Sequence, residues 1–252
     1  MPYKGDKDKG GSIMKEWYKK RRKSADKSEN IENNLEDPNL EPATDEELNE
    51  EEEFNSFFAE VLKKFPKKTS AVILKTYDKS KEQAEKILAK TKDQYNSIFD
   101  EFLVDVDEET KKRTHSTIHA ASLTAAIIGC SPIPFSDAFL LVPIQLTMMA
   151  RLHKIFDQKF SENLGESLAR ELVIVGLGRS AVGNLMKFVP AVGTVAGAAV
   201  NAVVASTITG ALGWVTVKML NDGEDIFEDV MSFKNQFNVL FNALKSSDKA
   251  TK

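Results

Sequence analysis

The sequence predicts an all-α protein, in which a helical hairpin precedes an apolar, Gly/Ala-rich helical bundle that we expect to associate with a membrane. Apolar residues recur at helical spacing along most of the chain, and no segment shows the alternation of a strand. Charge is distributed unevenly: the 252 residues include 34 Lys+Arg and 38 Asp+Glu, but residues 114–220 hold only 12 of these charges. Such an apolar block excludes a uniformly disordered chain.

Five segments follow from this pattern. They are a charged tail over 1–43, an amphipathic helical hairpin over 44–106, an apolar helical domain over 107–222, an amphipathic helix over 223–246 and a short tail over 247–252. The single cysteine, Cys130, excludes an internal disulfide and a Cys-rich metal site. The first thirty residues lack the apolar core of a signal peptide, so we expect a cytoplasmic N-terminus.

The N-terminal tail combines a basic run, Lys15–Lys27, with an acidic region that begins at Glu29. One interpretation is two solvated blocks of opposite charge. The other is contact with an anionic membrane surface, to which each Lys or Arg would contribute about 1 kcal/mol. The predicted contact residues are Trp17, Tyr18, Lys19, Lys20, Arg21, Arg22 and Lys23. A net charge of −4 argues against a dedicated nucleic-acid binder, and we expect no nucleic-acid partner.

The hairpin is predicted from two amphipathic stripes. Residues 44–47 (Thr-Asp-Glu-Glu) form a capping box, and the phenylalanine-rich stripe from Phe54 to Phe65 ends at Pro66. A second helix is predicted from about Thr69 to Val104, with apolar residues near heptad spacing. Both stripes are typical of helix packing, and the alternative is a groove-binding partner helix.

Residues 107–150 contain the first apolar block. Asp107 is a predicted N-cap. Pro132 and Pro134 break the helix, Ser136 is predicted to cap the next helix, and Pro143 to kink it. Each arm is short for a membrane span, and basic residues flank both ends of the block, which favours a re-entrant hairpin or a buried core pair.

The second apolar block, 189–217, has 29 residues without a charge. It begins with a GxxxG motif at Gly193 and Gly197, and small or polar residues continue the four-residue step. The predicted helix-packing residues are Gly193, Gly197, Asn201, Ala205 and Gly213. The block is long enough to span a bilayer, but a central bundle helix, buried on all sides, has the same composition. Residues 221–223 (Asn-Asp-Gly) predict its end.

Catalytic and cofactor motifs are incomplete. Residues 176–181 fit G-x-G-x-x-A, but no Asp or Glu lies between Glu171 and Asp222 to bind a ribose. The Walker spacing of Gly178 and Gly183 is followed by Asn-Leu where Lys-Ser/Thr is required, which excludes a P-loop. His115 and His119 share a helix face but lack a metal-binding set. We therefore predict no enzymatic activity, no cofactor and no metal site.

The segment 125–137 (AAIIGCSPIPFSD) and the residues after it carry a family resemblance. Over residues 110–220 the chain resembles the YcjF-like, GTPase-associated family of unknown function. Its signature here comprises Pro132, Pro134, Phe135, Asp137 and Gln145, at the predicted hairpin turn and beyond it. The resemblance implies a bacterial cytoplasmic-membrane location and an Era-like GTPase as partner in trans, because this chain has no P-loop. It supplies no catalytic residues, so the signature predicts structural or partner-contact roles.

These observations predict a non-enzymatic, membrane-associated helical protein that serves as partner or adaptor of a GTPase, with its N-terminus in the cytoplasm. Two alternatives remain open. One is a membrane-inserting effector or pore former, since a proline-turned hairpin and a glycine-zipper helix could insert and form homo-oligomers. The other is a soluble helical adaptor whose apolar block is an ordinary core.

Overall fold

The computed structural model describes residues 45–89, 100–132, 140–180 and 196–246. Every regular element in these ranges is a helix, which confirms the predicted all-α class. The described helices are α2 (Asp45–Lys64), α3 (Lys67–Lys75), α4 (Tyr77–Ala89), the 3₁₀ helix η2 (Asp100–Leu103), α6 (Glu108–Cys130), α7 (Val142–Ile155), α8 (Glu162–Ser180), α9 (Ala196–Asn221) and α10 (Val230–Ser246).

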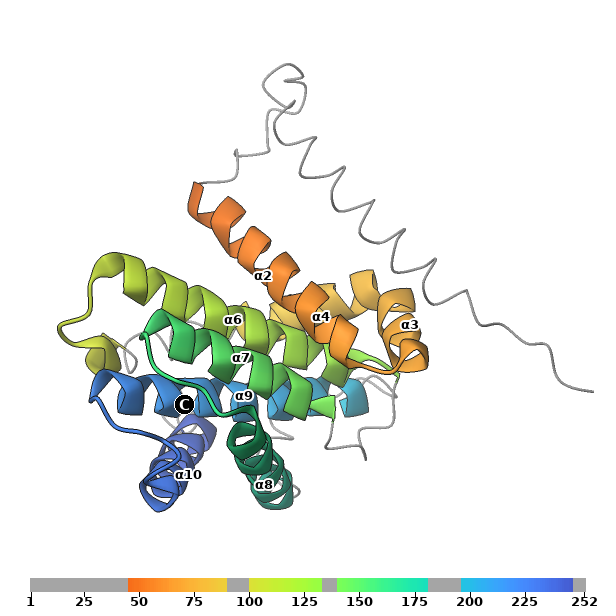
Figure 1. Ribbon diagram of the computed structural model, residues 1–252. Coiled ribbons are helices and arrows are strands. Elements are labelled where there is room, and N and C mark those ends of the chain that lie inside the picture. The colour runs from red at the N-terminus through yellow and green to blue at the C-terminus, as the bar shows by residue number, and fades with distance from the viewer. Residues whose placement is uncertain (1–44, 90–99, 133–139, 181–195, 247–252) are drawn as a thin grey trace, which may run out of the picture.

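The antiparallel pair α6 and α9 forms the centre of the bundle (Figure 1). Gly129 near the end of α6 meets Ala202 near the start of α9, and Ile118 meets Gly213 about three turns further along. Helix α9 also contacts α4, α7, α8, α10 and η2. Residues 202–209 and 211–217 are consequently buried without interruption, as expected for a helix that is apolar on every side.

Amphipathic helices cover this central pair. Helix α2 crosses α6 and α7 on one side, while α8 and α10 lie on the opposite side of the bundle (Figure 1). The stripe predicted in α2 faces inward: Phe54, Phe57 and Phe58 are at most 2% exposed. One hydrophobic core runs from these side chains to Leu244 in α10, so the hairpin segment and the apolar helices share a core.

The prediction of one continuous helix over 69–104 is wrong. The helix is interrupted at Thr76, which separates α3 from α4. The Thr76 backbone, at φ −107° and ψ 6°, leaves the helical region, and its N–H donates to the Ile73 carbonyl at 3.2 Å. The break allows Tyr77 to enter the core, where its ring centroid lies 5.0 Å from that of Phe58. Burial of this large aromatic ring stabilises the broken arrangement.

The predicted kink at Pro143 is also wrong. Helix α7 begins at Val142, which places Pro143 in the first turn. Backbone N–H groups in that turn have no intrahelical acceptor, so proline removes no helical hydrogen bond there. The proposed cap at Ser136 lies outside the described residues.

Two predicted helix ends are confirmed. The Asp107 carboxylate accepts a hydrogen bond from the Thr110 N–H at 3.0 Å and caps α6. At the end of α9, Gly223 adopts φ 74°, and its N–H donates to the Leu220 carbonyl, while the Glu224 N–H reaches the Met219 carbonyl. This paired pattern terminates the helix and favours glycine because φ is positive.

Candidate functional site

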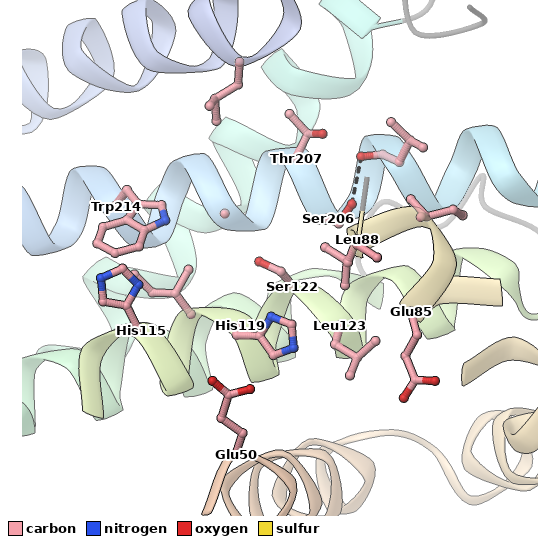
Figure 2. Close-up of a pocket in the computed structure, with 16 residues that line it drawn as sticks. Glu50, Glu85, Leu88, His115, His119, Ser122, Leu123, Ser206, Thr207 and Trp214 are labelled. Atoms are coloured by element: carbon pink, nitrogen blue, oxygen red, sulfur yellow. Dashed lines mark hydrogen bonds between the residues drawn. The ribbon is translucent and has the colours of Figure 1, made fainter. Parts of the chain in front are cut away.

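An apolar slot between α4, α6 and α9 is the candidate site. Its volume is about 310 Å³, near the lower end of the range that small-molecule pockets occupy. The deep wall consists of buried side chains from α6 and α9, among them Ile118, Leu123, Val203 and Trp214. Figure 2 shows the slot extending along these two helices, with His115 and Trp214 at one end and Leu123 towards the other.

The hydroxyl of Ser206 on the deep wall does not require a polar ligand. It donates to the carbonyls of Ala202 at 2.8 Å and Val203 at 3.1 Å in its own helix. Gly210 also lines the slot, and a Cβ built there would meet the Ser122 hydroxyl at an ordinary 3.4 Å. The deep part of the slot therefore suits apolar matter.

Polar and charged groups gather at the mouth of the slot. The half-buried His115 ring packs edge-on against Trp214, with centroids 4.8 Å apart. Glu50 of α2 extends towards His119, and Glu85 comes from α4 (Figure 2). Glu85 also pairs with Lys81 at 3.3 Å. Across the described part of the chain no three His, Cys, Asp or Glu side chains are grouped as a metal site would need, so the histidine pair acquires no additional ligands there.

A second polar site joins the covering helix to the bundle. Arg151 of α7 donates from Nη1 to Glu53 at 2.7 Å and from Nη2 to Glu60 at 2.7 Å, and its guanidinium lies 5.1 Å from the Phe57 ring centroid. Arg151 is one of the basic residues that flank the first apolar block in the sequence. Here it forms an ion-pair clamp between α2 and α7, and this clamp was not predicted from the sequence.

The family-signature residues are only partly described. Pro132 is exposed just after the end of α6, whereas Pro134, Phe135 and Asp137 lie outside the described residues. Gln145 is fully buried on α7, and neither its amide oxygen nor its amide nitrogen has a hydrogen-bond partner among the described groups. The proposed roles of these residues therefore stay predictions.

Of the packing residues predicted on α9, the backbone of Asn201 lies next to Gly129 of α6, and Gly213 lies next to Ile118 of α6. Asn201 is half-buried and Ala205 is buried, while a Cβ at Gly213 would lie 2.9 Å from Met148 Sδ. Gly193 and the side-chain surroundings of Gly197 lie outside the description. The predicted packing residues do not include Gly129, where a Cβ would lie 2.7 Å from the Ala202 backbone. A glycine inside an apolar helix was the available signal.

The predicted membrane-surface residues, from Trp17 to Lys23, precede the described ranges, so their contact with lipid stays a prediction. Two buried titratable groups were also missed. Burial raises the pKa of the Cys130 thiol to about 11. Burial lowers the pKa of His153, whose Nδ1 lies 2.7 Å from the Met149 carbonyl and whose ring packs between Phe160 and Phe227.

One described helix is long and apolar enough to cross a membrane. Within this stretch of α9, Ala198–Asn221, an 18-residue window has a mean hydropathy of 1.5, and 72% of that window is buried within the bundle. Length and composition alone do not separate a span from a central core helix, because both need an apolar surface on every side.

Part of this chain is similar to known proteins. Magnetosome membrane protein 22 of Magnetospirillum gryphiswaldense is 36% identical to this chain over 126 residues, which cover 46% of this chain and 63% of that protein. The aligned region is thus less than two thirds of the relative's length. No solved structure matches. The domain of unknown function DUF697 matches residues 94–245, from just before η2 to α10, and confirms the resemblance predicted from the sequence. Because this match covers more than half of the sequence, the chain belongs to the DUF697 family.

Proposed function

We propose that this protein is a membrane-associated helical adaptor without enzymatic activity. The observation that carries the proposal is α9, a helix apolar enough to span a bilayer whose closest neighbour, α6, meets it through small residues. The similarity to a protein named as a magnetosome membrane protein supports it.

The α6–α9 contact supports membrane association on physical grounds. In a bilayer, helices associate through close packing, since lipid is as apolar as the side chains. The contact of Gly129 with the Ala202 backbone and of Gly213 with Ile118 provides this kind of packing. The pair can therefore persist when lipid replaces the covering helices.

Liposome flotation tests this proposal. The purified full chain should rise with vesicles of bacterial phospholipids and stay bound in 1 M salt, because burial of apolar surface is insensitive to ionic strength. Deletion of residues 15–27 should weaken binding to anionic vesicles at low salt only. Quantitative recovery of the full chain in the lipid-free fraction would contradict membrane association.

The proposed partner is an Era-like GTPase, and this step rests on the family resemblance. The protein would hold such an enzyme at the cytoplasmic face of a bacterial membrane. Pull-down with a co-expressed Era-like GTPase, loaded with GTP or GDP, is the direct measurement. Binding to only one nucleotide state would support an adaptor role, and equal absence of binding in both states would reject that partner.

A soluble adaptor is the second candidate, because 72% of the 18-residue apolar window in α9 is buried inside the bundle. In that case the bundle would be stable without detergent and would not rise with liposomes. The flotation experiment separates the two candidates directly.

A further inference from the structure

We propose that the slot between α4, α6 and α9 binds one acyl chain of a membrane lipid whose head group carries an ammonium. The proposal relies on the proposed membrane association for the source of the ligand. The residues that line the slot determine the chemical class of the ligand.

The dimensions of the slot fit one chain. Its lining runs from His115 to Leu123 on α6 and from Val203 to Trp214 on α9, which corresponds to a length of about 12–16 Å at the rise of an α-helix. A cavity of about 310 Å³ over this length has room for an extended hydrocarbon chain.

The interior of the slot is mainly apolar, and the Ser122, Ser206 and Thr207 hydroxyls are its polar groups. Ile118, Leu123 and Val203 are buried on its deep wall, and the Ser206 hydroxyl is bonded to its own helix. A polar ligand would lose hydrogen bonds to water on entry without replacement from that hydroxyl. An alkyl chain loses none.

The charge at the mouth selects the head group. Glu50 and Glu85 bring two carboxylates from α2 and α4, and among the described residues the lining contains His115 and His119 but neither Lys nor Arg. Phosphate alone would be repelled by these carboxylates, whereas an ammonium would be attracted. Glu50 is the better candidate for the contact, because Glu85 already pairs with Lys81.

Tryptophan quenching tests the proposal. The chain has two tryptophans, so the Trp17→Phe variant leaves Trp214 in the slot wall as the only tryptophan, which is excited at 295 nm to avoid tyrosine emission. The probes are dodecylamine and dodecyl phosphate, each with a terminal bromine and each kept below its micelle concentration. Saturable one-to-one quenching by the amine, at a dissociation constant about fivefold or more below that of the phosphate, is expected.

Variants within the slot provide the second measurement. Ser206→Leu fills the interior and should weaken amine binding about tenfold or more. Thr216→Val is its matched control, because Thr216 makes the same type of bond, to the Leu212 carbonyl at 2.8 Å, on a part of α9 that does not line the slot. Glu50→Gln should remove the preference for amine over phosphate. Ala89→Phe, at an exposed position on the rim, provides a blocking variant that leaves the core intact.

Non-saturable quenching, or quenching unchanged in both Ser206→Leu and Ala89→Phe, would overturn the proposal. Flotation of the same variants separates it from membrane association. Flotation without saturable quenching would reject the slot and keep the adaptor at the membrane. Saturable quenching without flotation would keep the slot and reject a membrane as the source of its ligand.

Discussion

Helix α6 has two interfaces that differ in chemistry. Towards α9 the contact depends on small residues, with Gly129 against the Ala202 backbone and Gly213 against Ile118. Towards α2 it depends on large aromatic side chains, of which Phe57 and Phe58 are fully buried, and the ion-pair clamp at Arg151 adds to the neighbouring contact with α7. The first interface is a close approach of backbones, and the second is burial of hydrophobic area.

This difference indicates how each interface responds to its surroundings. Burial of aromatic area is favourable because it removes the rings from water, and that advantage disappears in lipid or detergent. Close packing of backbones depends on shape and persists in an apolar solvent. We therefore expect the α2 layer to separate first when the protein meets a membrane, while α6 and α9 remain paired.

The largest effect is expected from Phe58→Ala in α2. Phe58 is fully buried and packs against Phe54 at 5.6 Å and Tyr77 at 5.0 Å between ring centroids. Its truncation should lower the free energy of unfolding by about 3–5 kcal/mol, measured by urea denaturation and circular dichroism. The exposed Val239→Ala is the control and should change it by less than about 0.5 kcal/mol. The loss should shrink in mild detergent; an equal loss there would argue against the proposed difference.

Gly129→Val tests the other interface. The added side chain would overlap the Ala202 backbone, and we expect a loss of about 1–3 kcal/mol in the free energy of unfolding. Gly210→Ala is the matched control, because its Cβ meets the Ser122 hydroxyl at an ordinary 3.4 Å and gains up to about 1 kcal/mol of helix propensity. The Gly129→Val loss should persist in detergent. A control as damaging as the test would mean that the close approach is not specific to Gly129.

The difference between local and long-range contacts explains which features could be predicted from the sequence. The stripe of α2, the cap at Asp107 and the stop at Gly223 depend on neighbours within a few residues, and the sequence contains that information. The break at Thr76 and the Arg151 clamp depend on partners far along the chain, since Tyr77 packs on Phe58 and Arg151 reaches Glu53. Local propensity does not specify such contacts.

The candidate slot could not be predicted from the sequence, because it also depends on contacts between residues far apart in the chain. Its walls come from α4, α6 and α9, and its rim also uses Glu50 of α2. The histidine pair at its mouth was noted from i, i+4 spacing, but the spacing did not show that Trp214 lies beside His115. The small residues on α9 indicated helix packing. They also help to form an apolar slot, but the slot can be recognised only when the relative positions of α4, α6 and α9 are known.

Arg151→Met tests the contribution of the clamp to α2 docking. Arg151 is 21% exposed and its partners Glu53 and Glu60 are 28% and 43% exposed, so solvent weakens both ion pairs. We expect a loss of about 1–2 kcal/mol in stability that becomes smaller in high salt. Arg170→Met is the control, because its pair with Glu166 lies on the surface of a single helix, and should cost less than about 0.5 kcal/mol. Equal costs would show that the clamp contributes no more than a surface pair.

The smallest expected effect is the pH dependence of stability that His153 causes. This residue of α7 packs against Phe227 in the turn before α10. Its ring is 2% exposed between Phe160 and Phe227, and burial lowers its pKa below the ordinary 6.5, opposed by the Met149 carbonyl and the Asp225 carboxylate. The unfolded chain then binds a proton at a higher pH than the folded one does. Stability should accordingly be complete above pH 6.5 and decline as pH falls below it, until the folded-state pKa is passed.

His153→Phe isolates this effect, since the replacement fits between two phenylalanine rings and does not titrate. The difference in unfolding free energy between the wild type and this variant should be constant above about pH 7 and shift against the wild type between pH 6.5 and 5. Because the His153 ring packs against Phe160 and Phe227 and not against an α2 aromatic ring, the Phe58→Ala variant should show the same pH dependence as the wild type. A pH-independent difference for His153→Phe would mean that other groups cause the acid sensitivity of the bundle. A pH dependence altered by Phe58→Ala would show that the α2 layer and the α10 side are coupled, which would weaken the separation between the two interfaces of α6.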